Sequence, residues 1–365
     1  MDANFEYIFP AIRGIQAGRE YYVSMCPLRL IPKIFIFNEE ELVPELRAQR
    51  ILNKSRVPEM ASYIVDHKDA YVFSAITASI NGEVRFDTFG QDGEASRVGS
   101  LHVDMQSQFI INDGQHRRAA IEQALRAEPR LGDETIAVVF FLDRGLERCQ
   151  QMFADLNRYA IRPSRSLGLL YDHRDDRAQL AKLVALKSQA FKDLVEMEKS
   201  TLSARSRKLF TLSAIYSGNS ALLDGQELEL IEDAASLCAD FWDEVDKHLP
   251  EWRFVRESKM TAGDVRRDFI HSHAIILQAL GHVGRHLVQG KKISWKRNLK
   301  KLRDINWSRS DTKTWEGRAL IGGRVSKATS NVTLTTNLIK QKLNIPLTPE
   351  EQRVEDAFLR GDHGN

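Results

Sequence analysis

The fold is decided by residues 109–120, which read FIINDGQHRRAA. An apolar run, predicted to be a strand, leads through Asn112-Asp113-Gly114 into a stretch with helical character that extends to Ala127. Asp113 or Asn112 can cap this helix by accepting a hydrogen bond from its first free amides, and Gly114 permits a positive φ. The remaining amides and the helix dipole form an anion site. The sequence therefore predicts a strand–turn–helix whose turn is a candidate phosphate site.

Polar and basic side chains follow the glycine directly. Arg117 can donate two hydrogen bonds to one phosphate, and His116 adds a donor or a titratable group. The alternative is an ordinary capped helix on which Arg117 and Arg118 are merely exposed. The residues that we expect to bind a DNA phosphate or a nucleotide phosphate at this turn are Asp113, Gly114, Gln115, His116 and Arg117.

Short apolar runs alternate with helical stretches over the first 145 residues, which predicts a mixed α/β sheet. The expected strands are 34–37, 71–80, 84–86, 108–111 and 136–142. Beyond Arg144 only helices are expected, at about 146–157, 177–199, 205–216, 227–248 and 265–287. We therefore predict an α/β domain of residues 1–165, a helical domain of residues 166–345, and a charged tail of residues 346–365 that frays.

The composition is that of an ordinary globular protein, with 42% apolar and 28% charged residues among 365. The longest apolar run has about seven residues, whereas a bilayer span needs about 20, so we expect no membrane contact. Cys26, Cys149 and Cys238 are too few and too far apart for a disulfide framework. His282 and His286 share a helix face without a third ligand at matching spacing, so we expect packing there and no metal site. These features favour a cytoplasmic protein.

Positive charge is concentrated between Lys291 and Lys327, where twelve Lys or Arg face three acids, while the remainder of the chain carries −7. Such a stretch creates a potential that a polyanion can use. Trp295, Trp307 and Trp315 lie in the same stretch and either stack on bases or pack inward. Thr and Asn side chains at 331–343 are a weaker hint of base contacts. The residues expected to contact DNA here are Lys291, Lys292, Lys296, Arg297, Lys300, Lys301 and Arg303.

The motif Asp113-Gly114-Gln115-His116-Arg117 resembles the DGQHR signature of a bacterial family whose fold is similar to the nucleotide-binding module of ParB and sulfiredoxin proteins. The segments 9–14 (FPAIRG) and 21–28 (YYVSMCPL) resemble the DndB family, the regulatory members of the DNA phosphorothioation system. The related DGQHR proteins of 7-deazaguanine DNA modification are the nearest confusable family. The resemblance implies a ParB-like mixed-sheet core and a role in regulating DNA modification.

A second resemblance to ParB modules lies at 153–158 (FADLNR). In those modules a Glu-Asn-x-x-Arg box supplies groups near a metal and a triphosphate, and Asp155, Asn157 and Arg158 occupy comparable places at a different spacing. The alternative is a helix end with a surface acid. Arg162 and Arg165 extend the stretch into a basic ridge that we expect to contact DNA together with Arg117.

The expected function is a DNA-binding, nucleoid-associated repressor of the modification operon, whose partners are duplex DNA at its own promoter and other proteins of the modification system. A homo-oligomer is compatible with such a role. The alternative is a ParB-like hydrolase that binds ATP or CTP with Mg²⁺ and has weak activity, with Asp155 as its candidate catalytic residue. A third possible function is that of an adaptor that touches DNA weakly. Cys26 is either a small buried apolar residue or a thiol that senses redox state or contacts DNA. Motifs of other enzyme classes, such as a Walker lysine turn or His-Glu-x-x-His, are absent from the sequence.

Overall fold

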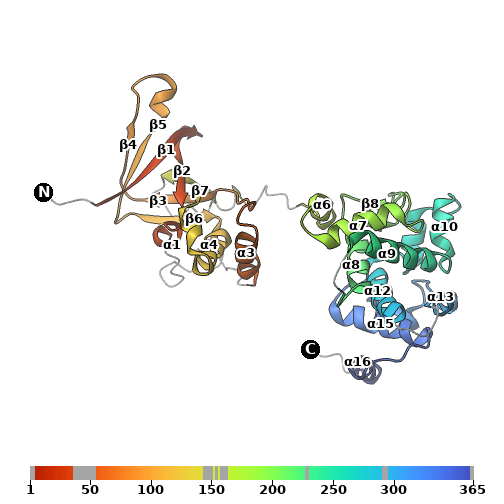
Figure 1. The fold of residues 1–365 in the computed structure, drawn as a ribbon. Coiled ribbons are helices and arrows are strands. Elements are labelled where there is room, and N and C mark those ends of the chain that lie inside the picture. Colours follow the sequence, from red (N-terminus) through yellow and green to blue (C-terminus); the bar gives the residue numbers. More distant parts are fainter. Residues whose placement is uncertain are drawn as a thin grey trace. The chain divides into compact units, whose positions relative to one another are not determined.

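The structure is a computed structural model that describes residues 5–35, 55–142, 151–152, 155–156, 163–226, 230–289 and 295–361. Contacts between Cα atoms divide the chain into two compact units, Met1–Ile161 (unit 1) and Arg162–Asn365 (unit 2). Figure 1 shows the sheet of unit 1 and the helices of unit 2. None of the described helices is long and apolar enough to cross a membrane.

Unit 1 is built on a seven-stranded mixed sheet with the order β4-β5-β1-β2-β7-β3-β6. Strands β3 and β7 are parallel, and the other neighbouring pairs are antiparallel. The strands are β1 (Glu6–Gln16), β2 (Arg19–Pro27), β3 (Ile76–Asn81), β4 (Val84–Thr88), β5 (Val98–Asp104), β6 (Gln108–Asp113) and β7 (Thr135–Leu142).

Three helices among the described residues complete the core of unit 1: α1 (Ile31–Ile34), α3 (Arg56–Asp66) and α4 (Gln115–Ala127). Alternate strand residues such as Phe9, Leu101 and Phe140 are buried in one cluster with Ile64 and Ile121 of the helices. Short 3-10 turns lie at Gly93–Arg97 and Pro129–Asp133. The predicted mixed α/β sheet is confirmed.

Unit 2 is helical. Its central contact joins α8 to α12, where a Cβ on Gly281 would lie 2.2 Å from the carbonyl oxygen of Gly218, so only glycine allows this close approach. The helices are α6 (Arg165–Tyr171), α7 (Asp176–Lys187), α8 (Leu212–Leu222), α9 (Ile231–Asp246), α10 (Pro250–Arg256), α11 (Ala262–Asp268), α12 (Ala274–Gln289), α13 (Trp295–Leu299), α14 (Thr312–Trp315), α15 (Thr329–Lys342) and α16 (Pro349–Arg360).

Two short strand pairs and a 3-10 turn complete unit 2. They are β8 (Val195–Glu196) with β9 (Phe210–Thr211), β10 (Leu320–Ile321) with β11 (Arg324–Val325), and the turn η3 (Lys300–Asp304). The predicted helical C-terminal half is confirmed as a class.

Several predicted elements differ from the structure. The strand expected at 34–37 is wrong at its start, because Ile34 ends helix α1, whose Ile31 and Ile34 are buried; residues 36 and 37 lie outside the described part. The helix expected at 177–199 ends at Lys187, and that expected at 205–216 begins only at Leu212. The stretch between these two helices carries β8 and β9 and packs Phe191 and Phe210 into the core.

The stretch predicted to fray as a charged tail contains the ordered helix α16. A capping box at Thr348 and Glu351 starts this helix. Glu355 is buried and accepts two hydrogen bonds from the guanidinium of Arg318. The bond from Arg318 Nη1 to Glu355 Oε2 is 3.0 Å long. Arg318 also lies over the ring of Phe358. These contacts pair charges that are 37 positions apart, so composition alone does not reveal them.

Candidate functional site

The turn after β6 has the geometry that the sequence predicts. Gly114 takes the left-handed conformation with φ 108° and is the N-cap residue of α4. A Cβ at this position would lie 3.1 Å from both Ile76 Cγ1 and Arg117 Nη2. Only glycine therefore combines this backbone with this packing.

The predicted capping of α4 by Asp113 or Asn112 is wrong, since no side chain caps this helix. Asp113 accepts a hydrogen bond from Arg117 Nη2 at 2.6 Å instead. Asn112 is fully buried, and its amide donates to Ser79 Oγ at 2.7 Å and to Met152 Sδ at 3.1 Å.

The guanidinium of Arg117 lies against the turn. Besides Asp113 it donates to the carbonyl oxygen of Ala75 at 3.1 Å, and its side chain is 18% exposed. Its Nε is buried and has no partner in the described part of the chain. A buried N–H without a partner is costly, so this atom is a ready donor for a ligand oxygen.

The two neighbours of Arg117 behave differently. Burial lowers the pKa of His116, and the positive charges of Arg56 and Arg117 lower it further while Asp113 opposes them. His116 is therefore neutral at pH 7. Arg118 donates to the carbonyl oxygens of Phe35 and Pro32 and pairs with Glu122 at 2.5 Å.

The alternative of a helix with merely exposed arginines is wrong, because Arg117 and Arg118 are both turned inward. Of the expected turn residues, Gly114 is buried, and the side chains of Asp113, Gln115, His116 and Arg117 are half-buried. The structure thus brings these five residues together at the start of α4. We call residues 113–117, where phosphate binding is a prediction from the sequence, the phosphate turn.

Little of the second ParB-like stretch is described. Asp155 is exposed and accepts a hydrogen bond from Gln151 at 2.8 Å. Asn157, Arg158 and Arg162 lie outside the described residues. Within the described part, no three His, Cys, Asp or Glu side chains gather to hold a metal ion.

Arg165 belongs to unit 2, where it is exposed and lies 5.5 Å from the ring centre of Tyr216. It is the part of the expected basic ridge that the structure describes. Nothing places it beside the phosphate turn.

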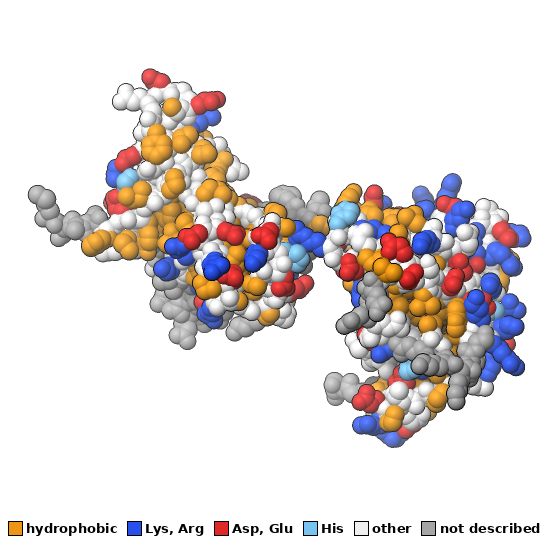
Figure 2. Space-filling view, viewed as in Figure 1, with side chains coloured by type: hydrophobic (Ala, Val, Ile, Leu, Met, Phe, Trp, Pro, Cys, Tyr) orange, Lys and Arg blue, Asp and Glu red, His pale blue; other side chains and the backbone are white. Residues whose placement is uncertain are grey.

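Helix α13 and the turn η3 (residues 295–304) form the first described part of the basic segment 291–327. Leu299, Leu302 and Trp307 anchor it in the core of unit 2. The cations on its outer side are exposed or half-exposed, and none forms an ion pair with a described residue. Figure 2 shows Lys and Arg side chains on the side of unit 2 that carries α10 and α13. We call the following residues the basic surface: Lys296, Arg297, Lys300, Lys301 and Arg303. Lys291 and Lys292 lie outside the described residues.

Two of the three tryptophans of the basic segment cannot stack on bases. Trp307 and Trp315 are buried and stack on each other with ring centres 5.4 Å apart. Trp295 is half-buried and packs near Phe241. Most of the base contacts suggested for α15 are also unavailable, because Asn331, Thr335, Thr336 and Asn337 are buried, whereas Thr333 is half-buried.

Cys26 points into the core of unit 1 and is fully buried. Burial raises the pKa of its thiol to about 11, although the hydrogen bond with Ser24 acts in the opposite direction. The environment fits the small buried apolar residue of the two alternatives, and it leaves the thiol without access to DNA.

The fold and the turn together define an α/β protein with a helical second unit, a phosphate-turn candidate and a separate basic surface. The chain belongs to the DndB family, whose model, described as DNA-sulfur modification-associated, matches residues 9–346 and so spans both units. Comparison with curated proteins finds no match, nor does comparison with solved structures. The likeness to ParB and sulfiredoxin modules therefore stays a prediction, whereas the association with DNA sulfur modification follows from the family.

Proposed function

We propose that this protein is a DNA-binding regulator that represses transcription of the operon encoding its DNA sulfur modification system. The observation that carries the proposal is the basic surface. Five cations project from α13 and η3 without an ion pair to a described residue. Proteins usually mix both signs on a solvated face, so five cations beside a single acid, Asp304, favour a polyanionic partner.

The basic surface has a rigid base. Leu299 and Leu302 are fully buried, and the indole of Trp307 donates to the carbonyl oxygen of Leu302 at 2.9 Å. Arg303 donates to the carbonyl oxygen of Lys247 at 3.0 Å. Cations held on a fixed backbone lose less freedom when they bind phosphates, which supports a grip on the duplex backbone.

Charge reversal tests this proposal. Each phosphate contact contributes about 0.9 to the slope of log K against log salt concentration, so losing four contacts flattens the slope by roughly 3 to 4. Fluorescence anisotropy with a labelled promoter duplex measures this slope over a salt series. The variant replaces Lys296, Arg297, Lys300 and Lys301 by Glu.

The matched control makes the same charge change on four exposed cations elsewhere in unit 2: Lys187, Lys342, Arg353 and Arg360. We expect the control to keep most of the wild-type affinity and slope. A well-folded basic-surface variant that binds as tightly as the control contradicts the proposed grip. If log K of the wild-type protein depends only weakly on log salt concentration, the result favours the adaptor that touches DNA weakly.

A second candidate function is a nucleotide-gated switch that takes ATP or CTP with Mg²⁺ at the phosphate turn. The buried, unpartnered Nε of Arg117 favours it. Gly114 lets a phosphate approach the first amides of α4, His116 supplies a neutral imidazole, and Arg117 supplies charge. Arg117→Ala should abolish nucleotide binding and any turnover; unchanged binding removes the turn from this role.

A further inference from the structure

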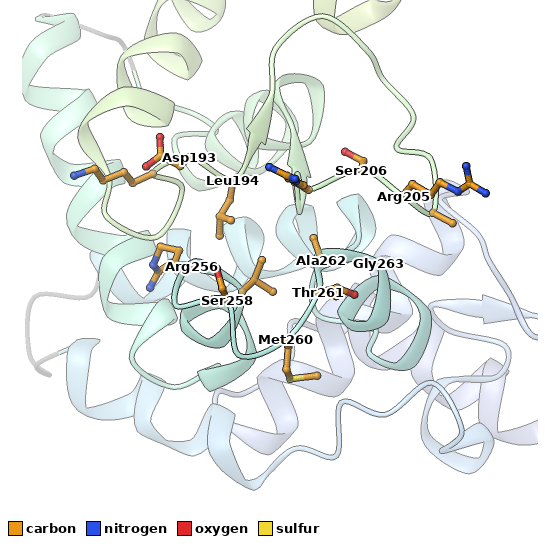
Figure 3. Close-up of a pocket in the computed structure, with 14 residues that line it drawn as sticks. Asp193, Leu194, Arg205, Ser206, Arg256, Ser258, Met260, Thr261, Ala262 and Gly263 are labelled. Atoms are coloured by element: carbon orange, nitrogen blue, oxygen red, sulfur yellow. The ribbon is translucent and has the colours of Figure 1, made fainter.

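A cleft in unit 2 carries cations that belong neither to the phosphate turn nor to the basic surface. Its volume is about 760 Å³. Figure 3 shows one wall formed by the loop that carries Arg205 and Ser206, and an opposite wall formed by the turn from Ser258 to Gly263, with Leu194 between them. A concavity of this size suits a ligand of nucleotide dimensions.

The lining of the cleft is cationic, with a single carboxylate, Asp193, among the lining residues. Arg256 is already occupied, because it pairs with Asp246 at 2.5 Å and donates to the carbonyl oxygen of Ala190. The other three cations are exposed and form no ion pair within the described part of the chain; they are Lys192, Arg205 and Arg207. These three side chains are free to bind an anion.

Arg266 of α11 holds the arginine-bearing loop from behind. Its guanidinium donates to the carbonyl oxygens of Ser203 at 2.7 Å, Ser206 at 3.3 Å and Lys208. Burial lowers the pKa of Arg266, yet a guanidinium stays charged at pH 7. This bracing fixes the backbone of the loop before any ligand arrives.

The opposite wall approaches the loop closely at Gly263, where a Cβ would lie 2.4 Å from the carbonyl oxygen of Ala204. Asp193 and Ser258 also line the cleft and take left-handed conformations with φ of 62° and 56°. Non-glycine residues rarely adopt this region, and such strain gathers at ligand sites. Because the cleft is preformed, it pays little ordering cost on binding.

Apolar side chains form the floor. Leu194 and Ala262 are buried, and Val255 and Met260 pack half-buried against the core of unit 2. An apolar floor below free guanidinium groups fits a phosphate ester that carries a sugar and a base. An acidic peptide would satisfy the cations but would leave this floor without a matching partner.

We propose that this cleft binds the phosphate of a nucleotide unit, either free or within a nucleic-acid backbone, through Lys192, Arg205 and Arg207. The assignment does not rest on the function proposed above, because it concerns different residues. Free and polymeric sources share the same phosphate chemistry, and separate probes distinguish them.

The test uses the full chain at low salt with two probes, a fluorescein-labelled duplex of unrelated sequence and fluorescently labelled ATP. The double variant Arg205→Ala/Arg207→Ala should bind at least one of the two probes more weakly than wild type does. Its dissociation constant should rise about tenfold or more for each charge-assisted hydrogen bond that is lost. The double variant Arg205→Lys/Arg207→Lys should keep part of the affinity that the alanine variant loses. The matched control Lys187→Ala/Arg353→Ala removes the same charge from exposed sites outside the cleft and should bind like wild type.

A loss confined to the duplex identifies a backbone phosphate, and a loss confined to ATP identifies a free nucleotide. The proposal fails if the folded double variant binds both probes as well as the control does. The proposal also fails if the wild-type protein binds neither probe. Binding of polyglutamate, an acidic peptide, in place of both probes is one such result. The cleft variant can lose duplex binding while the basic-surface variant keeps it. This result overturns the proposed DNA contact of the basic surface and supports the phosphate site in the cleft.

Discussion

Replacing Asp113 by asparagine should strengthen phosphate binding at the phosphate turn. The carboxylate of Asp113 lies 2.6 Å from Arg117 Nη2 and competes with any phosphate for this guanidinium. Arg117 is 18% exposed and Asp113 47%, so solvent screens the pair and its worth is about 1 kcal/mol. Releasing Arg117 should therefore tighten ATP or pyrophosphate binding about fivefold, measured by isothermal titration calorimetry at low salt.

Glu122→Gln is the matched control, because it removes one carboxylate from helix α4, which follows the turn that carries Asp113. Glu122 pairs with Arg118, which stays turned inward through its bonds to the carbonyl oxygens of Phe35 and Pro32. The control should leave phosphate affinity near the wild-type value. Equal affinity in the two variants, or weaker binding by Asp113→Asn, would refute the idea that Asp113 competes with phosphate for Arg117.

Three further predictions concern stability and reactivity. Glu355→Ala leaves Arg318 buried without its carboxylate and should lower the free energy of unfolding by about 3 to 5 kcal/mol. Urea unfolding followed by tryptophan fluorescence measures this loss, because all five tryptophans lie in unit 2. An unchanged urea midpoint would contradict the prediction. Burial lowers the pKa of His273 to about 4, below its usual 6.5, so the unfolded state takes up a proton first as pH falls. Between these values His273 alone should contribute a loss of about 1.4 kcal/mol in stability per pH unit. His273→Gln should make the pH dependence shallower by this share, whereas an identical pH profile contradicts the prediction. Cys26 and Cys238 are buried with pKa values raised to about 11 and about 12, so no more than one of the three thiols should react with Ellman's reagent before unfolding.

The strand–turn–helix was predictable because its signals are local. The strand β6, the left-handed Gly114 and helix α4 follow one another within twenty residues, and each has its own sequence signature. The inward turn of Arg117 was not predictable. It depends on the carbonyl oxygen of Ala75, which a different strand segment brings into reach.

Strands β1 and β2 carry weaker signals. Tyr7 and Phe9 face the core, but Ile8 and Ile12 on the other face are apolar as well, so the alternation of polar and apolar residues is lost. Pro10 in the middle of β1 also argues against a strand. The strand exists because its neighbours β2 and β5 pair with it on both sides.

The basic segment was predictable as a stretch of charge but not as a surface. Its cations divide by their distant partners: Arg318 is buried against Glu355, whereas Lys296 and Arg297 stay exposed. The cleft of unit 2 was not predictable for the same reason, because its loop at 203–208 is held by hydrogen bonds from Arg266, about 60 positions away.

The proposed regulator binds duplex DNA through phosphate contacts and recognises its own promoter. A salt series of wild-type binding to the promoter duplex and to an unrelated duplex, with and without ATP or CTP and Mg²⁺, tests it most directly. We expect steep salt dependence, tighter binding to the promoter than to the unrelated duplex, and the same affinity with and without nucleotide. Weak, salt-insensitive binding that shows no preference for the promoter would contradict it.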